Sequence, residues 1–216
     1  MKGNYLVIDT ETGGVDKDKH QITQIAMIGV NAADMKEIAR VETYIKPYMD
    51  LGLSKVALDK TGITRAQIDS GMEASEFVKT LFPDFCKVVR GGKKTRTNGV
   101  VIVGHNVSFD IAFLQKMFNG FGSDLSKEVS NNNGDILRID TQQFARLHWM
   151  SDLTSSENKS ITLTACCKRA EIELYDAHGA MQDTFATYQL LRYFTTLNNN
   201  VKLDVKEKKF RDTFQI

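Results

Sequence analysis

The chain has 216 residues, of which 42% are hydrophobic and 25% are charged, and its formal net charge is +1. This length suits one domain with a core large enough to fold without disulfides or a structural metal. The small net charge excludes a uniformly basic nucleic-acid-binding protein, so any contact with a polyanion must come from a local patch.

The cysteines and the apolar runs point to a cellular compartment. Cys86, Cys166 and Cys167 are odd in number and show no C-x-x-C spacing, which disfavours a disulfide framework or a zinc site and favours a reducing environment. The N-terminus lacks the pattern of a signal peptide, and no apolar run approaches the ~20 residues of a membrane helix. We therefore expect a cytoplasmic protein.

The first 47 residues predict three strands with short connections. The runs are YLVID (5–9), QITQIAMIGVN (21–31) and EIARVETYIKP (37–47). The first two are apolar enough to be buried, whereas the third alternates apolar and polar residues, as a half-buried strand does. The short connections favour antiparallel pairing, and Pro47 ends the set.

Helices and an exposed loop are predicted next. Residues 62–69 and 72–89 have helical patterns, the second interrupted at Pro83. The segment VVRGGKKTRTNG that follows is rich in glycine and basic residues and predicts an exposed basic loop over about 87–99.

The second half alternates strands and helices. The run GVVIVGHN (99–106) predicts a strand, and Ser108 is the expected N-cap of a helix over 108–118. A loop over 127–135 precedes a strand at 136–140 and a helix at 141–150.

The last elements are helices. Ser160 is the expected cap of a helix over 161–170, and a final helix includes 181–194 before a polar tail from Asn198. The order βββ–α–β–α–β–α–α predicts a mixed sheet covered by helices.

Two carboxylates stand at the end of the first predicted strand, in the run VIDTETGG (7–14). Asp9 and Glu11 are two residues apart, so on a strand they share a face at about 6.6 Å, a spacing at which they can share cations. For an isolated D-x-E pair, a strand end that faces solvent is the more common explanation.

Two further motifs carry acids at element junctions. In GHNVSFD, Asn106 and Asp110 lie where a buried strand meets a helix, the edge at which parallel sheets bind ligands. An acid in a first helical turn also suits the helix dipole. In HGAMQD, His178 precedes Asp183 at the start of the last helix. Each motif is weak by itself.

Together and in this order, the three motifs resemble those of the DEDDh (DnaQ-like) family of 3′→5′ exonucleases. The resemblance is greatest to the bacterial DNA polymerase proofreading epsilon subunit and to PolC-type exonuclease domains. Three more stretches agree with the family, namely GIT (62–64), ITQIAMIGV (22–30) and IDTQQFARL (139–147). The resemblance runs from about residue 4 to residue 195.

The resemblance implies a ribonuclease-H-like α/β fold. Its mixed five-stranded sheet has three antiparallel and two parallel strands, is flanked by helices, and carries the site at its carboxyl edge. The corresponding division is an exonuclease domain over 1–197, including the basic loop, and a polar C-terminal tail over 198–216.

The resemblance also implies roles for individual residues. His178 would be the general base, and two divalent cations, Mg²⁺ or Mn²⁺, would be bound by four acids: Asp9, Glu11, Asp110 and Asp183. The terminal nucleotide would be held by Thr12, Val15, Asn106 and Phe109. The alternative role of Phe109 is core packing, and that of Val15 is an ordinary turn position.

Three positions depart from the family pattern. Gly13 replaces a second threonine, Thr61 stands where the proofreading subunit often has histidine, and Gln24 occupies a strand position that often carries an acid. None of them removes a catalytic group, but they bear on how the substrate is held.

The expected activity is metal-dependent hydrolysis at single-stranded 3′ ends, with DNA as the substrate and 5′-mononucleotides as products. One alternative is RNA trimming of the RNase T or oligoribonuclease type. Others are a non-catalytic nucleic-acid-binding or polymerase-docking module, and a chain with surface acids and no site. A DNA polymerase is a candidate partner. The basic loop would contact phosphates through Arg90, Lys93, Lys94 and Arg96, or would be a solvated loop.

Overall fold

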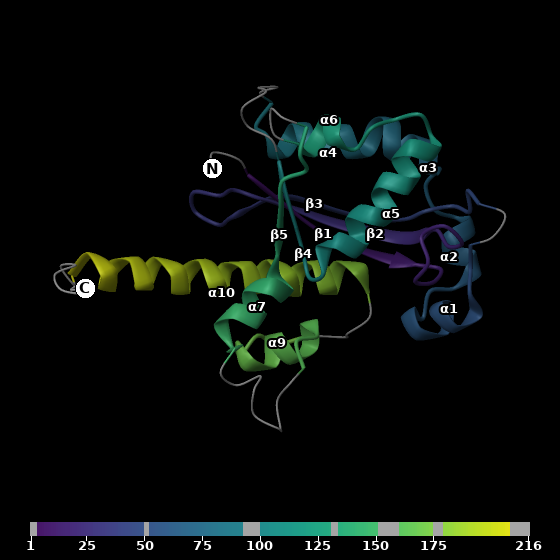
Figure 1. The fold of residues 1–216 in the computed structure, drawn as a ribbon. Coiled ribbons are helices and arrows are strands. Elements are labelled where there is room, and N and C mark those ends of the chain that lie inside the picture. The colour runs from purple at the N-terminus through teal and green to yellow at the C-terminus, as the bar shows by residue number, and fades with distance from the viewer. Residues whose placement is uncertain are drawn as a thin grey trace, which may run out of the picture.

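A five-stranded sheet forms the centre of the molecule in the computed structural model, with the strand order β3-β2-β1-β4-β5 (Figure 1). The structure describes residues 4–49, 52–92, 100–130, 134–150, 160–174 and 179–207, with side chains up to residue 197. No helix within these ranges combines the length and the apolar character needed to cross a membrane.

The sheet is mixed. The strands are β1 (Tyr5–Thr12), β2 (Ile22–Val30), β3 (Glu37–Tyr44), β4 (Val101–Gly104) and β5 (Arg138–Asp140). β2 pairs antiparallel with both β1 and β3, whereas β4 runs parallel to β1 and to β5. The predicted set of three antiparallel and two parallel strands is confirmed.

The helices follow the predicted order. Between β3 and β4 lie α1 (Lys55–Thr61), α2 (Arg65–Asp69), α3 (Ala74–Glu76), a π-helical turn η1 (Phe77–Leu81) and α4 (Phe82–Val89). After β4 come α5 (Val107–Gly120), α6 (Ser126–Val129), α7 (Thr141–His148), α9 (Leu163–Arg169) and α10 (Ala180–Glu207).

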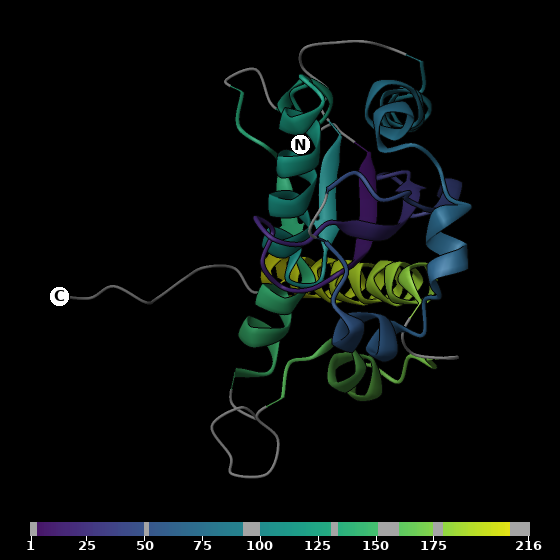
Figure 2. The same cartoon turned by 90° about the vertical axis from the view of Figure 1, so that its right-hand side faces the viewer.

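The two faces of the sheet are covered by different helices (Figures 1 and 2). Because side chains alternate along a strand, Leu6 and Ile8 of β1 join a large core with Phe82 of α4. Val7, which points the other way, packs with Leu191 of α10. Odd-numbered residues of β1 therefore face α10, and even-numbered residues face α4 and α5.

Two predicted helix caps were each wrong by two positions. α5 begins at Val107, before Ser108, and its N-cap is Asn106 with a φ of 67°. Asparagine tolerates this left-handed conformation, which lets the chain turn sharply out of β4. α9 is capped by Thr162 in place of Ser160, because the Thr162 hydroxyl accepts a hydrogen bond from a backbone N–H of the first turn.

Pro83 does not interrupt its helix, contrary to the pattern seen in the sequence. A wide π turn precedes it, in which the Phe82 N–H donates to the Phe77 carbonyl oxygen, and Pro83 stands in the first turn of α4. A proline costs little there, since the first N–H groups of a helix need no partner within it. Likewise, part of the predicted loop over 127–135 is helical, because α6 continues to Val129.

The basic loop is only partly described. Arg90 does not face solvent as predicted: its guanidinium is 8% exposed and pairs with the Glu128 carboxylate at 3.0 Å, which ties the end of α4 to α6. Lys93, Lys94 and Arg96 lie outside the described residues. The predicted tail begins inside a helix, since the backbone of α10 continues past Asn198 to Glu207.

Candidate active site

Asp9 and Glu11 lie inside a paired strand rather than at its exposed end. β1 extends to Thr12, with Asp9 opposite Ala26 of β2 and Glu11 opposite Gln24. Both acids share the face of Val7, which is the face covered by α10. Backbone pairing therefore fixes the two carboxylates on the same side of the sheet.

Asp183 joins these two acids from the first turn of α10. One carboxylate oxygen from each of Asp9, Glu11 and Asp183 lies within 4.8 Å of the others, close enough for a shared cation. The strand β1 and the helix α10 thus bring Asp183, which is distant in the sequence, next to Asp9 and Glu11.

Asp110 reaches the same region from α5, on the opposite face of the sheet. Its Oδ1 atom accepts hydrogen bonds from the Thr10 backbone N–H at 3.0 Å and from the Thr10 hydroxyl at 2.7 Å. Thr10 lies between Asp9 and Glu11 and points toward α5, so it fixes Asp110 beside them. Asp110 is only 4% exposed.

Burial and neighbouring charges suppress the ionisation of three of the four acids, Asp9, Glu11 and Asp110. Burial raises the pKa of Asp9 well above its ordinary value, and the charges of Asp110 and Glu11 raise it further. Burial and then the charge of Asp183 raise the pKa of Glu11 to about 7. Burial also raises the pKa of Asp110 to about 7, although its bonds from Thr10 act in the opposite direction.

This donor set fits divalent cations of the hard class. Carboxylate oxygens are the ligands preferred by Mg²⁺ and Mn²⁺. Bound cations would also offset the negative charge of the ionised carboxylates, whose repulsion contributes to the raised pKa values. The described His and Cys residues add no ligand to the acid group that could hold a metal, so nothing described there favours a soft metal. An acidic cluster able to bind metal is therefore present, as predicted.

A cavity of about 280 Å³ opens over the cluster. It is lined by all four acids and by the four residues predicted to hold the substrate: Thr12, Val15, Asn106 and Phe109. The structure therefore brings together every predicted site residue that it describes. His178 is the exception, since it lies outside the described residues, and its role stays a prediction.

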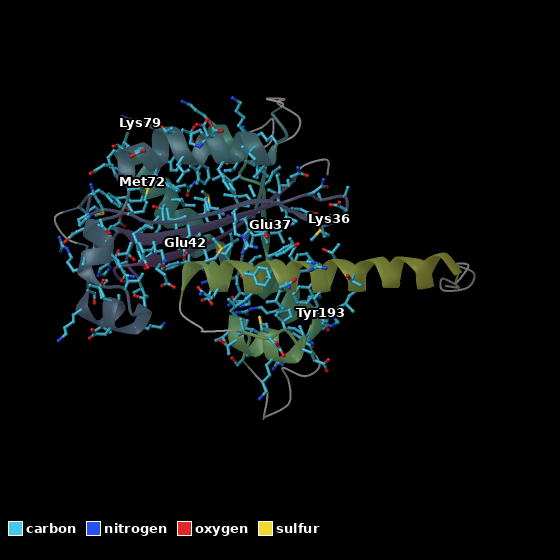
Figure 3. All side chains as sticks on the ribbon, turned by 180° about the vertical axis from the view of Figure 1, so that it is seen from behind. Lys36, Glu37, Glu42, Met72, Lys79 and Tyr193 are labelled. Atoms are coloured by element: carbon cyan, nitrogen blue, oxygen red, sulfur yellow. The ribbon has the colours of Figure 1, made fainter. Side chains whose placement is uncertain are left out.

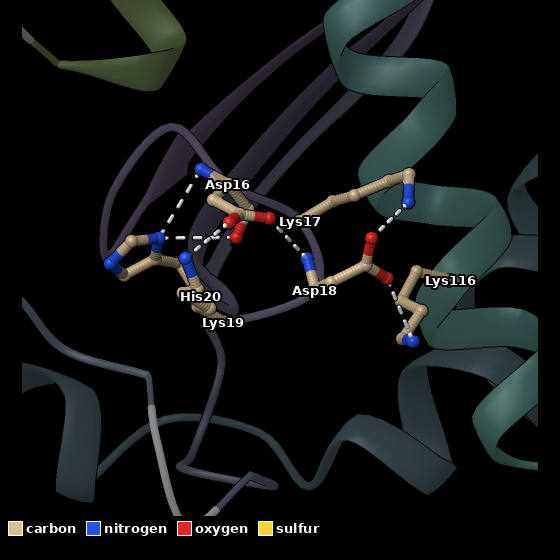
Figure 4. A network of polar contacts seen from close by, with 6 residues as sticks. All are labelled: Asp16, Lys17, Asp18, Lys19, His20 and Lys116. Carbon is tan, nitrogen blue, oxygen red and sulfur yellow. Dashed lines mark hydrogen bonds and ion pairs between the residues drawn. The ribbon is translucent and has the colours of Figure 1, made fainter.

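Polar contacts order the turn between β1 and β2 that follows Val15, from Asp16 to His20 (Figure 4). The Asp16 N–H donates to His20 Nδ1 at 3.2 Å, and Asp18 pairs with Lys116 of α5 at 3.0 Å. Val15 itself is 84% exposed. An exposed apolar side chain that lines a cavity is compatible with ligand contact and also with the alternative of an ordinary turn position, so the role of Val15 stays a prediction.

Gly13 is required by its surroundings. A Cβ atom at this position would lie 1.7 Å from the Gly52 carbonyl oxygen. The Gly13 backbone also accepts from the Ser54 N–H and donates to the Gln21 carbonyl oxygen. A threonine side chain would therefore push the segment that leads into α1 away from residue 13. This explains why glycine stands here in place of the second threonine of the family pattern.

Phe109 and Asn106 are held at the rim by α5 and β5. The Phe109 ring lies 4.8 Å from that of Phe113, so one side of it packs on the core while the residue also lines the cavity. The Asn106 N–H donates to Asp140 Oδ1 at 3.0 Å. The Phe109 ring therefore takes part in core packing and also lines the cavity, and its contact with a nucleotide stays a prediction.

Sequence reasoning did not assign Ala57, Lys60 or His105 to the cavity that they line, and it noted Thr61 only as a departure from the family pattern. Ala57, Lys60 and Thr61 lie at i, i+3 and i+4 on α1 and so share its face. The charge of Lys60 lowers the pKa of Glu11, against the stronger effects of burial and Asp183. The spacing in KVALDKT could have indicated this face, but not its direction.

The remaining one of these four residues is His105, next to Asn106. Its Nδ1 lies 3.0 Å from the Thr141 hydroxyl and its Nε2 lies 2.8 Å from the Ile161 carbonyl oxygen, and burial lowers its pKa. These contacts join the end of β4 to the start of α7 and to the segment before α9.

Comparisons with known proteins find relatives among bacterial DNA polymerases. PolC-type DNA polymerase III of Bacillus cereus is 29% identical over 187 residues, which are 87% of this chain and 11% of that protein. The enzyme of the same name from Bacillus subtilis is 28% identical over 187 residues, again 11% of its length. The chain thus spans about a tenth of these polymerases.

Solved structures of Escherichia coli Exonuclease I share the fold. The complex with a dT13 oligonucleotide has a TM-score of 0.73 at 21% identity, over 94% of this chain and 43% of the other. The zinc-bound complex with single-stranded DNA has a TM-score of 0.75 at 22% identity, over 92% and 42%. These likenesses confirm the predicted ribonuclease-H-like fold.

A model of the RNase T family, described as exonuclease, matches residues 6–191. This range contains the four acids, from Asp9 to Asp183, and all of the sheet except Tyr5, the first residue of β1. The chain therefore belongs to this exonuclease family.

Proposed function

We propose that this chain is a metal-dependent 3′→5′ exonuclease that releases 5′-mononucleotides from single-stranded DNA. The observation that carries the proposal is the convergence of four carboxylates from β1, α5 and α10 in one cavity. The pKa values of Asp9, Glu11 and Asp110 are raised, so holding these acids together is a cost to the fold. Acids that merely face solvent would not explain this cost.

The four acids would hold two divalent cations, Mg²⁺ or Mn²⁺. When bound, such a pair stabilises charge on the attacking and the leaving oxygen of a phosphodiester. Asp9, Glu11 and Asp183 would supply ligands from the α10 face, and Asp110 from the α5 face. The bonds from Thr10 would keep Asp110 in place for this role.

His178 would act as the general base. A neutral imidazole with a pKa near ~6.5 can take a proton from water at neutral pH. Its position in the sequence, two residues before α10, places it close along the chain to Asp183.

The cavity rim would hold the terminal nucleotide. Val15 and Phe109 offer apolar surfaces to bases, and packing of this kind tolerates any sequence. Lys60 offers a positive charge to a phosphate. Thr12 and Asn106 would contact the sugar-phosphate end.

DNA is the favoured substrate over RNA. The relatives at 27–29% identity are named as DNA polymerases, and the similar Exonuclease I structures contain single-stranded DNA. The RNA-trimming alternative remains open to test, because recognition of a 2′-hydroxyl requires contacts that the acids do not supply. A DNA polymerase remains the candidate partner, and a cytoplasmic location the expectation.

A non-catalytic binding module is the weaker candidate, because the described part of the site retains all four acids. We keep the division into an exonuclease domain over 1–197 and a tail over 198–216 as a proposal. The basic side chains at Lys93, Lys94 and Arg96 remain candidates for phosphate contacts.

A degradation assay tests the proposal. Single-stranded DNA and RNA of one sequence, each labelled at the 5′ end, are incubated with Mn²⁺, with Mg²⁺ or with chelator. We expect a ladder that shortens from the 3′ end of DNA with either metal, and none in chelator or with Asp9→Ala. Asp69→Asn, at an exposed acid of α2 paired with Arg65, is the matched control and should remain active.

Each alternative has its own outcome. If RNA is shortened faster than DNA, RNA and not DNA is the preferred substrate. Shortening of either nucleic acid in chelator would contradict the metal site. Binding of single-stranded DNA without any shortening would favour the non-catalytic module.

A further inference from the structure

Two side chains of the sheet cap the first turn of α10. The Ala180 backbone N–H donates to Gln24 Oε1 of β2 at 3.4 Å, and the Met181 N–H donates to Glu42 Oε1 of β3 at 3.3 Å. The first N–H groups of a helix have no partner inside it, so these bonds satisfy donors that would otherwise lack one. The negative charge of Glu42 also suits the positive end of the helix dipole.

Gln24 and Glu42 are bound to each other as well. The Gln24 Nε2 atom donates to Glu42 Oε1 at 2.8 Å, and Gln24 is only 5% exposed. An amide can donate and accept at once, whereas an ionised carboxylate can only accept. An amide on β2 beside a carboxylate on β3 therefore completes the set of bonds, and this gives a physical reason for glutamine at position 24.

The pair lies next to the acid cluster. Gln24 is directly opposite Glu11 in the β1–β2 pairing, and Ala180 is three residues before Asp183. In Figure 3, Glu42 lies beside the first turn of α10, and Glu37 lies farther along the same strand. The capping bonds thus connect the helical turn that carries Asp183 to the strand that neighbours Glu11.

We infer that Gln24 and Glu42 position Asp183 for metal binding by holding the first turn of α10 against β2 and β3. The inference rests on the metal site of the proposed function. Carboxylates that share a cavity repel one another, and a helix end can move away from a sheet more easily than a paired strand can. Loss of such an outer contact typically costs about 10- to 100-fold in metal affinity or activity.

Removal of the Glu42 carboxylate tests the inference at an exposed position, where the fold should survive. Calorimetric titration with Mn²⁺ should show an increase in Kd of about tenfold for Glu42→Ala, on the scale of lost outer contacts. In the degradation assay kcat should fall while KM for single-stranded DNA stays within about twofold of the wild type, because the cavity rim is unchanged.

The matched control is Glu37→Ala on the same strand. Glu37 pairs with Arg40 and makes no bond to the first turn of α10. Its Mn²⁺ affinity should equal that of the wild type. Equal Kd values for the two alanine variants would overturn the inference.

A reciprocal exchange tests the hydrogen-bond pattern itself. Gln24→Glu alone sets two acceptors against each other, so its Kd for Mn²⁺ should rise by at least tenfold. The double variant Gln24→Glu/Glu42→Gln restores one amide and one carboxylate, and its Kd should return to within about threefold of the wild type. A double variant no better than Gln24→Glu would contradict the inference, as would a single variant with unchanged affinity.

Failure of the inference and failure of the proposed function give different results. Calorimetry with Mn²⁺ needs no catalysis. If the wild type binds Mn²⁺ but does not degrade DNA, only the proposed function fails. The Kd values of the variants then still test the inference. If the wild type degrades DNA and Glu42→Ala binds Mn²⁺ as tightly as the wild type does, only the inference fails. Absence of Mn²⁺ binding by the wild type overturns both.

Discussion

The acid cluster consists of two parts that are held in different ways. Asp9 and Glu11 stand on β1, which is paired with β2 along its whole length and with β4 over its first half. Asp183 stands on the first turn of α10, which is held through side chains such as Gln24 and Glu42. Sheet pairing fixes a carboxylate through the backbone, whereas a helix end depends on individual residues that a single substitution can remove.

The largest effects should come from removing one acid from either part of the cluster. Asp9→Asn keeps the side-chain size but removes a charge from the cation site, so activity should fall on the order of 10⁴-fold, the scale seen when a group that acts as part of a catalytic unit is lost. Asp183→Asn should cost a similar factor, because both acids would bind the same cations. Single-turnover hydrolysis at saturating Mn²⁺ measures both losses, and a mild effect of either variant would remove that acid from the site.

The next effect separates chemistry from metal binding. His178→Ala should lower kcat by about 10²- to 10⁴-fold, the range for loss of a general base. The increase in melting temperature that Mn²⁺ causes should be the same as in the wild type, because the acids remain. Loss of that increase together with activity would make His178 a ligand or a structural residue.

Protonation should reveal the repulsion that both parts share. The folded pKa values of Glu11 and Asp110 are raised to about 7, and that of Asp9 is raised as well, so between about pH 4 and about pH 7 the metal-free folded state binds more protons than the unfolded state. The free energy of unfolding of the metal-free protein should therefore fall as the pH rises through this window.

Metal should reverse that trend. Saturating Mn²⁺ binds the ionised carboxylates, so the difference in melting temperature between metal-bound and metal-free protein should grow from pH 5 to pH 7. Thermal unfolding at fixed ionic strength measures it. A difference that is constant with pH would show that the acids are not the ligands.

The smallest effect should come from the cavity rim, outside both parts of the cluster. Lys60→Ala removes a positive charge that faces the cavity, so KM for single-stranded DNA should rise about three- to tenfold, the loss expected for one charge-assisted contact. The value of kcat should change little, because the acids are untouched. A fall in kcat with unchanged KM would place Lys60 in the chemistry and not in substrate binding.

The strand part of the site was the more predictable from sequence. The spacing of Asp9 and Glu11 gives their common face directly, because side chains of a strand alternate with a fixed period. The three antiparallel and two parallel strands of the sheet, and the grouping of Asp110 with Asp9 and Glu11, also follow from the resemblance. The extension of β1 to Thr12 was not foreseen, since polar residues after an apolar run resemble a strand end.

Residues that act through long-range contacts were less predictable. The roles of Gln24 and Gly13 depend on α10 and on Gly52, which are far away in the sequence. Arg90 had the composition of a basic loop, yet it pairs with Glu128, a partner 38 residues away. Local patterns carry little information about such partners.

The central claim, that four converging carboxylates make this chain a metal-dependent exonuclease, has one most direct measurement. It is the release of 5′-mononucleotides from single-stranded DNA, followed by chromatography as Mn²⁺ is titrated into the metal-free wild type and Asp183→Asn. The account predicts that release by the wild type rises with Mn²⁺ to a plateau and is absent at every concentration in the variant. Release that does not depend on metal, or an active variant, would contradict it.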